Sequence, residues 1–238
     1  MENYEVEKRL RTVTLKFALK TFSAPISEEQ AWSLLYLGVS KMAKLFQGYA
    51  TCYIPCSLED VLITSDGDVE DQTFLSRSGL EKKELNNLGT GVAEFAVLVY
   101  DALDWALGSW EQRQLGDQLE SLISWMTSVD DEEQDDEGIS IGDEEAGQAI
   151  CQRVFESCQH HCIAVGVKYP KQTISISLYF NVKDDLYCTR IHYGRVCKLL
   201  YEEVEELSAI TSRLDPETLK ELELIERREW AEEFNRVR

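Results

Sequence analysis

The sequence predicts a mainly α-helical fold with one small β-hairpin. Apolar residues recur at spacings of three and four over most of the chain, which is the period of a helix face. A hydrophobic content of 44% over 238 residues is enough to build a core. We expect a single domain over 1–238, made of an N-terminal helical half (12–128), an acidic, disordered loop (129–147) and a C-terminal helical half (148–238).

The first strong helix signal begins at Ser27. Its hydroxyl can cap the helix, and Gln30, three residues on, can reach back to complete a capping box. The inward positions that follow recur at helical spacing over about five turns: they are Ala31, Leu34, Leu35, Met42 and Phe46.

The period changes in residues 58–75, where Val61 and Ile63 alternate with polar neighbours. Asp66-Gly67 is a type I′ turn signal, and a second run leads to Phe74 and Leu75. This segment therefore predicts a short hairpin.

Two helices should follow the hairpin. Residues 88–110 are apolar on nearly all sides in their first half, which is typical of a helix covered by other helices. Residues 115–128 form a shorter amphipathic segment, whose expected inward residues are Leu119, Leu122, Ile123 and Met126.

The C-terminal half is helical again from Gln148. A second helix is predicted over 193–214 by the spacing of Val196, Leu199, Leu200, Val204 and Leu207. A last helix starts with Asp215 as cap and Pro216 at the first helical position, and continues to the chain end. Between the first two, residues 173–180 alternate like a strand.

Negative charge is concentrated in one region. The formal net charge is −20, and residues 101–150 account for −14 of it, with fifteen acids and one base. Nucleic acid and anionic membranes are poor partners for such a chain, because phosphate binding needs clustered Lys and Arg. The N-terminus offers no signal peptide or membrane span, so we expect a cytoplasmic protein with a basic partner.

The sequence contains no complete catalytic or metal-binding motif of the kinase or zinc-site type. The Gly-rich loop, catalytic-loop Asp with its Asn, and Asp-Phe-Gly of a kinase are all missing from the sequence. Cys158, His160, His161 and Cys162 lie within five residues, but one helix would point them to several faces and no second Cys-x-x-Cys pair completes a zinc site. We therefore expect no enzyme, no cofactor and no metal, with the seven cysteines reduced.

The acid-rich region allows two interpretations. Runs of carboxylates such as 128–145, where ten of eighteen residues are acidic, are most often solvated and merely solubilising. The segments before this run, however, interleave carboxylates with aromatic residues. Fixed acids beside aromatic surface would make a groove for a basic peptide. These residues are Tyr100, Asp101, Asp104, Trp105, Trp110, Glu111, Asp117 and Glu120.

Several segments together resemble the KIND domain of the Spire actin-nucleation proteins. They include "FSAPISEEQAWSLLYL", "LEDVLITSDGDV", "VLVYDALDWAL", "LGDQLESLISWM" and the closing "REWAEEF", in the same order over nearly the whole chain. The resemblance implies the fold of a protein-kinase C-lobe without catalytic residues, acting as an adaptor.

The resemblance also implies a partner, the basic C-terminal tail of a formin, bound in an acidic groove. By matching segment, the groove candidates are Tyr100, Asp101, Asp104, Trp105, Asp117 and Glu120, with Glu111 as a weaker one. We expect the acidic run to steer the tail electrostatically without fixed contacts; its residues are Asp130, Asp131, Glu132, Glu133, Asp135, Asp136 and Glu137.

Two departures from the family pattern stand out. Residues 166–187 look like an insertion. The actin-binding repeats, myosin-binding segment and membrane-binding zinc finger of Spire proteins are missing, so we expect actin contact only indirectly or through other regions, and no direct membrane binding. Association with the cytoskeleton or vesicles would belong to a full-length protein.

Two other hypotheses fit the same sequence features. A polyanionic chaperone or nucleic-acid mimic would bind generic basic proteins through the acidic run. A hydrolase built on the Cys and His cluster would require stoichiometric zinc.

Overall fold

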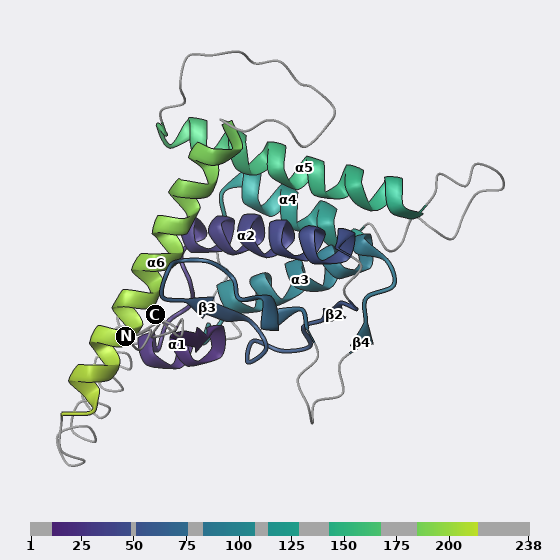
Figure 1. The fold of residues 1–238 in the computed structure, drawn as a ribbon. Coiled ribbons are helices and arrows are strands. Elements are labelled where there is room, and N and C mark those ends of the chain that lie inside the picture. Colours follow the sequence, from purple (N-terminus) through teal and green to yellow (C-terminus); the bar gives the residue numbers. More distant parts are fainter. Residues whose placement is uncertain are drawn as a thin grey trace, which may run out of the picture.

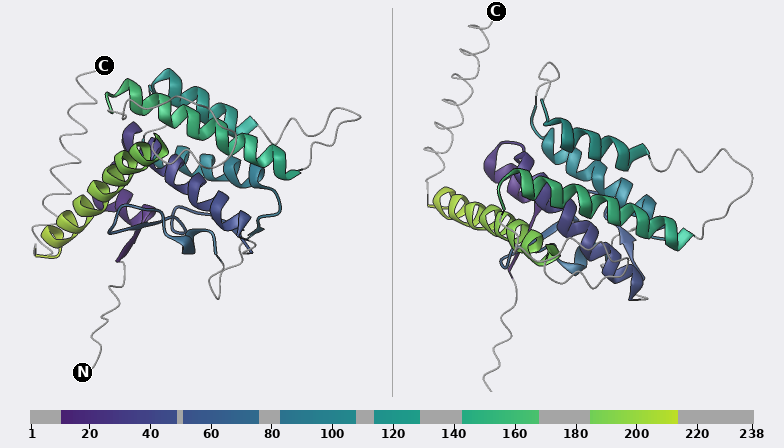
Figure 2. Two further views of the ribbon diagram at one scale, coloured as in Figure 1. Left: turned by 45° about the horizontal axis from the view of Figure 1, so that its top comes forward. Right: turned by 90° about the horizontal axis from the view of Figure 1, so that it is seen from above.

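The helices stack in layers around α2 (Figures 1 and 2). The computed structural model describes residues 11–48, 51–75, 83–107, 114–128, 143–167 and 185–213. Helix α2 packs against α3, α5 and α6, while α4 contacts both α3 and α5. The prediction of a mainly helical fold is confirmed. The helices are α1 (Leu15–Phe22), α2 (Glu28–Gln47), α3 (Leu88–Leu103), α4 (Asp117–Ser128), α5 (Asp143–Ala164) and α6 (Asp185–Thr211).

Helix α2 begins with the predicted capping box. The Ser27 hydroxyl accepts a hydrogen bond from the backbone N–H of Gln30 at 3.2 Å, and the Gln30 side chain accepts one from the Ser27 N–H at 2.8 Å. Two backbone N–H groups at the helix start, those of Ser27 and Gln30, are thus satisfied. The predicted inward residues Ala31, Leu34, Leu35 and Met42 are fully buried, and Phe46 is half-buried.

Two small antiparallel sheets lie beside the helices. Strand β1 (Thr12–Thr14) pairs with β3 (Leu62–Thr64), and β2 (Tyr53–Ile54) pairs with β4 (Lys83–Glu84). The predicted hairpin over 58–75 is only partly correct. Strand β3 does fold back to an isolated bridge between Ile63 and Val69, but its main partner is the N-terminal β1.

The turn of this hairpin differs from the predicted type I′. Thr64 N–H donates to the Asp68 carbonyl, and Gly67 N–H to the Thr64 carbonyl, so the loop has three residues, Ser65 to Gly67. A type I′ turn needs positive φ at both central residues, whereas here only Gly67 has it, at 81°. The chain then enters a 3₁₀ turn (Asp71–Thr73), so Phe74 is buried from a turn and not from a strand.

Three predicted boundaries are corrected. The helix expected over 88–110 ends at Leu103, and Ala106 follows with φ of 60°. Nothing in the local pattern indicates this stop, because Ala rarely adopts positive φ. The range 129–147 expected for the acidic loop overlaps α5, which begins at Asp143; acidic residues are favourable in a first helical turn. The insertion expected over 166–187 overlaps α6, which begins at Asp185.

Two elements predicted for the C-terminal half lie outside the described residues. These are the strand-like alternation of 173–180 and the helix after Asp215. Within the described part, no helix is long and apolar enough to cross a membrane.

The apolar stripe predicted on α6 is only partly buried. Leu200 and Val204 are fully buried, but Leu199 and Leu207 are 57% and 39% exposed. The helix crosses the edge of the stack and continues past it (Figure 1), so its sequence period alone could not show where the core ends.

A carboxylate of α2 joins α5 and α6. Glu29 Oε2 lies 3.4 Å from Nε2 of His161 on α5, and Glu29 Oε1 is hydrogen-bonded to Nε2 of His192 on α6. The His161 ring stacks on Trp32 with centroids 4.6 Å apart, and its Nδ1 lies 3.1 Å from the hydroxyl of Tyr193. This cluster holds three helices together at one end.

Stability should fall in mild acid because of His161. Burial lowers its pKa, with the charge of His192 acting in the same direction and those of Glu29 and Glu28 opposing it. The unfolded chain therefore binds more protons below the ordinary histidine pKa, and stability present at neutral pH is lost as pH falls through that range.

The test is urea unfolding between pH 7.5 and 5. We expect His161→Gln to flatten the slope of the unfolding free energy by up to about 1.4 kcal/mol per pH unit, the limit for one proton. Equal slopes for the two proteins would contradict the assignment.

Candidate partner-binding groove between helices α3 and α4

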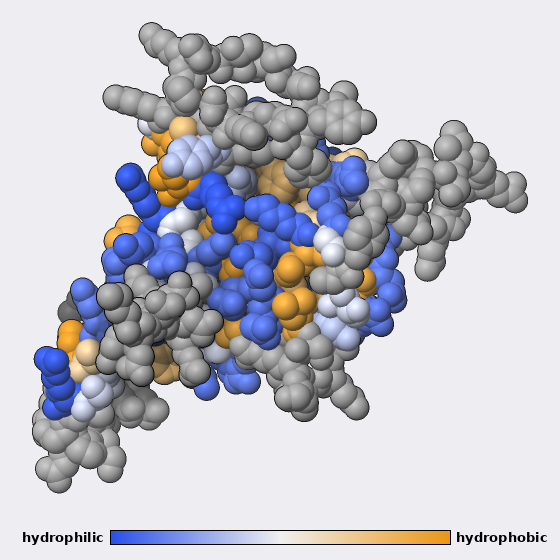
Figure 3. Space-filling model, in the orientation of Figure 1, coloured by the Kyte–Doolittle hydropathy of each residue, from blue (hydrophilic) through white to orange (hydrophobic). Residues whose placement is uncertain are grey.

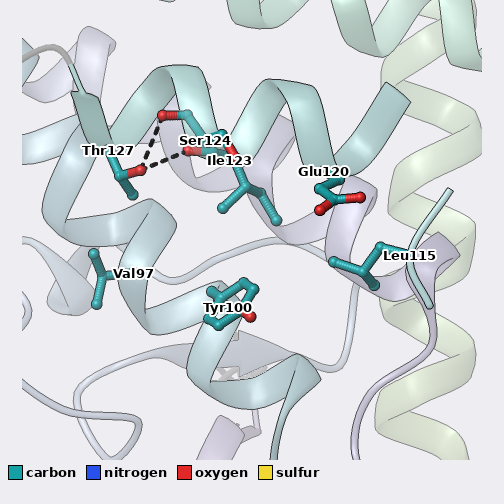
Figure 4. Close-up of a pocket in the computed structure, with 7 residues that line it drawn as sticks. All are labelled: Val97, Tyr100, Leu115, Glu120, Ile123, Ser124 and Thr127. Atoms are coloured by element: carbon teal, nitrogen blue, oxygen red, sulfur yellow. Dashed lines mark hydrogen bonds between the residues drawn. The ribbon is translucent and has the colours of Figure 1, made fainter. Parts of the chain in front are cut away.

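A hollow of about 270 Å³ opens on the surface between α3 and α4 (Figure 4). Its volume is smaller than that of a typical small-molecule site, so it suits one or two side chains of a larger partner. The lining residues are Val97 and Tyr100 from α3, Leu115 from the preceding loop, and Glu120, Ile123, Ser124 and Thr127 from α4. We call this site the α3–α4 groove.

Helix α3 is buried on most sides but is exposed where it lines the α3–α4 groove. Phe95, Ala96 and Val99 are buried, whereas Val97 and Tyr100 are 42% and 43% exposed. These two residues are three apart and therefore neighbours on one side of the helix. Exposed apolar side chains that gather at a hollow mark an interaction surface more often than single ones do.

Negative charge converges on the Tyr100 hydroxyl. The charge of Asp104 is the main reason that the pKa of Tyr100 is raised, followed by burial, a hydrogen bond to Asp104 and the charge of Glu120. Asp104 follows the end of α3 and Glu120 lies on α4. The aromatic ring is therefore flanked by carboxylates from two separate elements.

No base balances these acids within the two described segments. Residues 88–107 and 114–128 contain no Lys or Arg. A cationic side chain entering the groove would thus meet a net negative field from these two segments, although Arg153 of α5 stacks on Trp125 of α4. The acids are Glu94, Asp101, Asp104, Asp117 and Glu120.

The start of α4 is anchored by α2. Glu28 accepts a hydrogen bond from the backbone N–H of Gly116 at 3.0 Å, directly before the first residue of α4. Leu115 packs against the core beside it. Residues from the beginning of the domain therefore fix the helix that carries Glu120.

The structure brings some of the predicted groove residues together. Tyr100 and Glu120 line the α3–α4 groove, and Asp104 lies close to Tyr100. Asp101 and Asp117 are exposed on the same two helices but do not line the hollow. They would act on a partner only through its flanking residues.

The other predicted residues are placed differently. Trp105 is half-buried and packs against the hydrophobic core from the turn after α3. Glu111 and the acidic run 130–137 lie outside the described residues.

Sequence reasoning missed part of the lining. Val97 was hidden in a helix that looks apolar on all sides, and Leu115, Ser124 and Thr127 carry no pattern of their own. Ile123 is inward as predicted, at 5% exposure, and also forms part of the hollow. The pairing of Val97 with Tyr100 at a three-residue spacing was the available signal.

The Cys and His cluster on α5 is divided between different surroundings. Cys158 and Cys162 are fully buried, and burial raises the pKa of the Cys158 thiol well above its usual range. His160 is exposed, while His161 contacts Glu29. The four side chains do not converge on one point.

Comparison with known proteins identifies the family. Residues 13–212 match the kinase non-catalytic C-lobe domain, abbreviated KIND. This chain belongs to the KIND family. The KIND domain is 28% identical over 219 residues to the zebrafish (Danio rerio) protein spire homolog 1, covering 88% of this chain and 27% of the relative. It is also 28% identical over 210 residues to mouse (Mus musculus) protein spire homolog 2, covering 85% and 26%.

The family agrees with the helical C-lobe fold and with the missing kinase motifs. This KIND domain is a non-catalytic module, and its role is protein interaction. A second zebrafish relative, protein spire homolog 2, matches over 237 residues at 27% identity. The chain spans only about a quarter to a third of the length of these relatives, between 26% and 34% of each.

Proposed function

We propose that this KIND domain binds the basic C-terminal tail of a formin in the α3–α4 groove. One observation carries the proposal: Tyr100 stands exposed at a hollow with Asp104 and Glu120 beside it, and no base lies on either helix. A short segment with Lys or Arg next to an apolar side chain fits this combination.

The two kinds of contact have different roles. An apolar side chain of the tail would enter the hollow against Val97, Tyr100 and Ile123 and supply most of the affinity, as buried anchors do at interfaces. Cationic side chains would pair with the exposed carboxylates around it, raising the association rate and choosing the orientation. The acidic run 130–137 would add long-range attraction.

In a longer Spire-type protein, this interaction would couple two actin nucleators during filament assembly and vesicle transport. The proposal rests on the resemblance of the segments to the Spire family and on relatives that are named as spire homologs. Actin would then be bound by other regions and not by the KIND domain.

Titration calorimetry tests the proposal directly. A formin tail peptide and a scrambled peptide of equal charge are each titrated into the chain at low and at physiological salt. We expect the native tail to bind at about micromolar strength and the scrambled one at least tenfold more weakly, a difference of about 1.4 kcal/mol.

The outcome that overturns the proposal is equal binding of both peptides that vanishes with added salt. The acidic residues would then attract any basic peptide through long-range electrostatics alone, and the polyanionic chaperone hypothesis would describe the protein better. A chain in which the acids of the run 130–137 are replaced by Asn and Gln separates the two further, since the groove should retain selectivity for the native tail without these charges, and α5, which begins at Asp143, stays intact.

A further inference from the structure

The end of α6 projects beyond the body of the domain (Figures 1 and 2). Val204 is the last buried residue of the helix, and none of residues 205–213 is buried. A helix end without packing contacts is marginally stable in water, because most helical stability in proteins comes from a packed apolar face. We therefore expect another helix or strand to pack against these last turns.

An apolar strip runs along this part of α6. Leu199, Leu207 and Ile210 are 57%, 39% and 55% exposed. At 3.6 residues per turn they fall within about 80° of one another around the helix axis, beside the buried side formed by Tyr193 and Leu200. Hydrophobic surface is visible along the left edge of Figure 3, where α6 lies.

The chain continues for 25 residues after Arg213, and their sequence matches this strip. Leu219, Leu222, Ile225 and Trp230 recur at helical spacing, behind Asp215 and Pro216 as a start signal. Leu207 and Leu219 lie six residues on either side of Arg213, and Val196 and Trp230 lie seventeen on either side. Antiparallel helices joined by a short turn would bring such pairs together.

We infer that residues 214–238 fold back along α6 as an antiparallel helix and cover Leu199, Leu207 and Ile210. The family match ends at residue 212, so it does not extend over this segment. The inference is independent of the α3–α4 groove.

A second copy of the chain is the competing occupant, and two facts oppose it. Each copy carries a net charge of −20, and Glu203 and Glu206 are exposed within the strip itself, so two copies would repel each other. The C-terminal segment, in contrast, is tethered by only a few residues, which gives it an effective concentration in the millimolar range.

Hydrogen exchange on the full chain tests the inference. We expect amides of residues 217–234 to be protected, and Leu207→Asp to make them exchange at least tenfold faster. Ala209→Asp is the matched control, because it places the same charge on an exposed position of the same helix end, away from the strip. The control should leave protection of 217–234 unchanged.

Two results would overturn the inference. One is exchange of residues 217–234 at the rate of an unfolded peptide in the unmodified chain. The other is protection that rises with protein concentration together with a dimer mass in light scattering, which would assign the strip to a second copy. Equal loss of protection in the two variants would likewise refute a specific contact at Leu207.

Discussion

Tyr100→Ala should weaken binding of the formin tail by about thirtyfold, which corresponds to about 2 kcal/mol. The ring is the largest exposed apolar group of the α3–α4 groove, and it stands between two carboxylates. Because the substitution removes contact area and no formal charge, the loss should be nearly the same at low and at high salt. Calorimetry at two salt concentrations measures both quantities.

Glu120→Lys provides the complementary result. Reversing an exposed charge replaces an attraction by a repulsion, and we expect about tenfold weaker binding at low salt that shrinks as salt is added. Glu203→Lys, on the exposed side of α6, makes the same change in net charge away from the groove and should have little effect. If Glu203→Lys weakens binding as much as Glu120→Lys, or if Tyr100→Ala binds like the unmodified chain, the groove assignment is wrong.

Gly38→Ala should destabilise the domain by about 2 kcal/mol. Gly38 lies in α2 at the contact with α3, and a Cβ there would overlap ring atoms of Phe95, well inside van der Waals distance. The overlap should cost about 3 kcal/mol, which exceeds the gain of about 1 kcal/mol that Ala brings to a helix interior. Urea unfolding measures the difference.

Two further variants make this prediction specific. Gly48→Ala, at the end of the same helix with φ of −76°, should change stability by less than about 0.5 kcal/mol. Phe95→Leu, which shortens the ring side chain, should reduce the cost of Gly38→Ala when the two are combined, since residues in contact are coupled. A stabilised Gly38→Ala protein would show that α2 and α3 pack less closely than described.

The sequence predicted several elements because their signals are local. The capping box at Ser27 and Gln30 needs only a three-residue spacing, and the inward residues of α4 follow from one helical period. The turn at Gly67 was placed correctly, although its type was not, because the φ of Asp66 depends on how the strand continues. Boundaries failed where nothing local changes, as at Leu103, the last residue of α3.

The candidate groove illustrates the same division. Tyr100, Asp104 and Glu120 could be named from acid and aromatic spacing together with the family resemblance. The packing of Trp105 against the core could not be predicted in this way. An aromatic residue among acids can be buried or exposed, and the neighbouring elements determine which. Val97 is likewise exposed because it lines the hollow between α3 and α4, which the sequence does not indicate.

By itself, the sequence determined the helical class, the helix starts with strong caps and the local concentration of negative charge. All of these depend on residues close together along the chain. The tertiary structure alone decided that Glu28 anchors α4, that Glu29 joins His161 to His192, and that Leu199 and Leu207 are exposed. These features depend on contacts between residues far apart in sequence, and a periodic pattern carries no information about which distant surface will cover it.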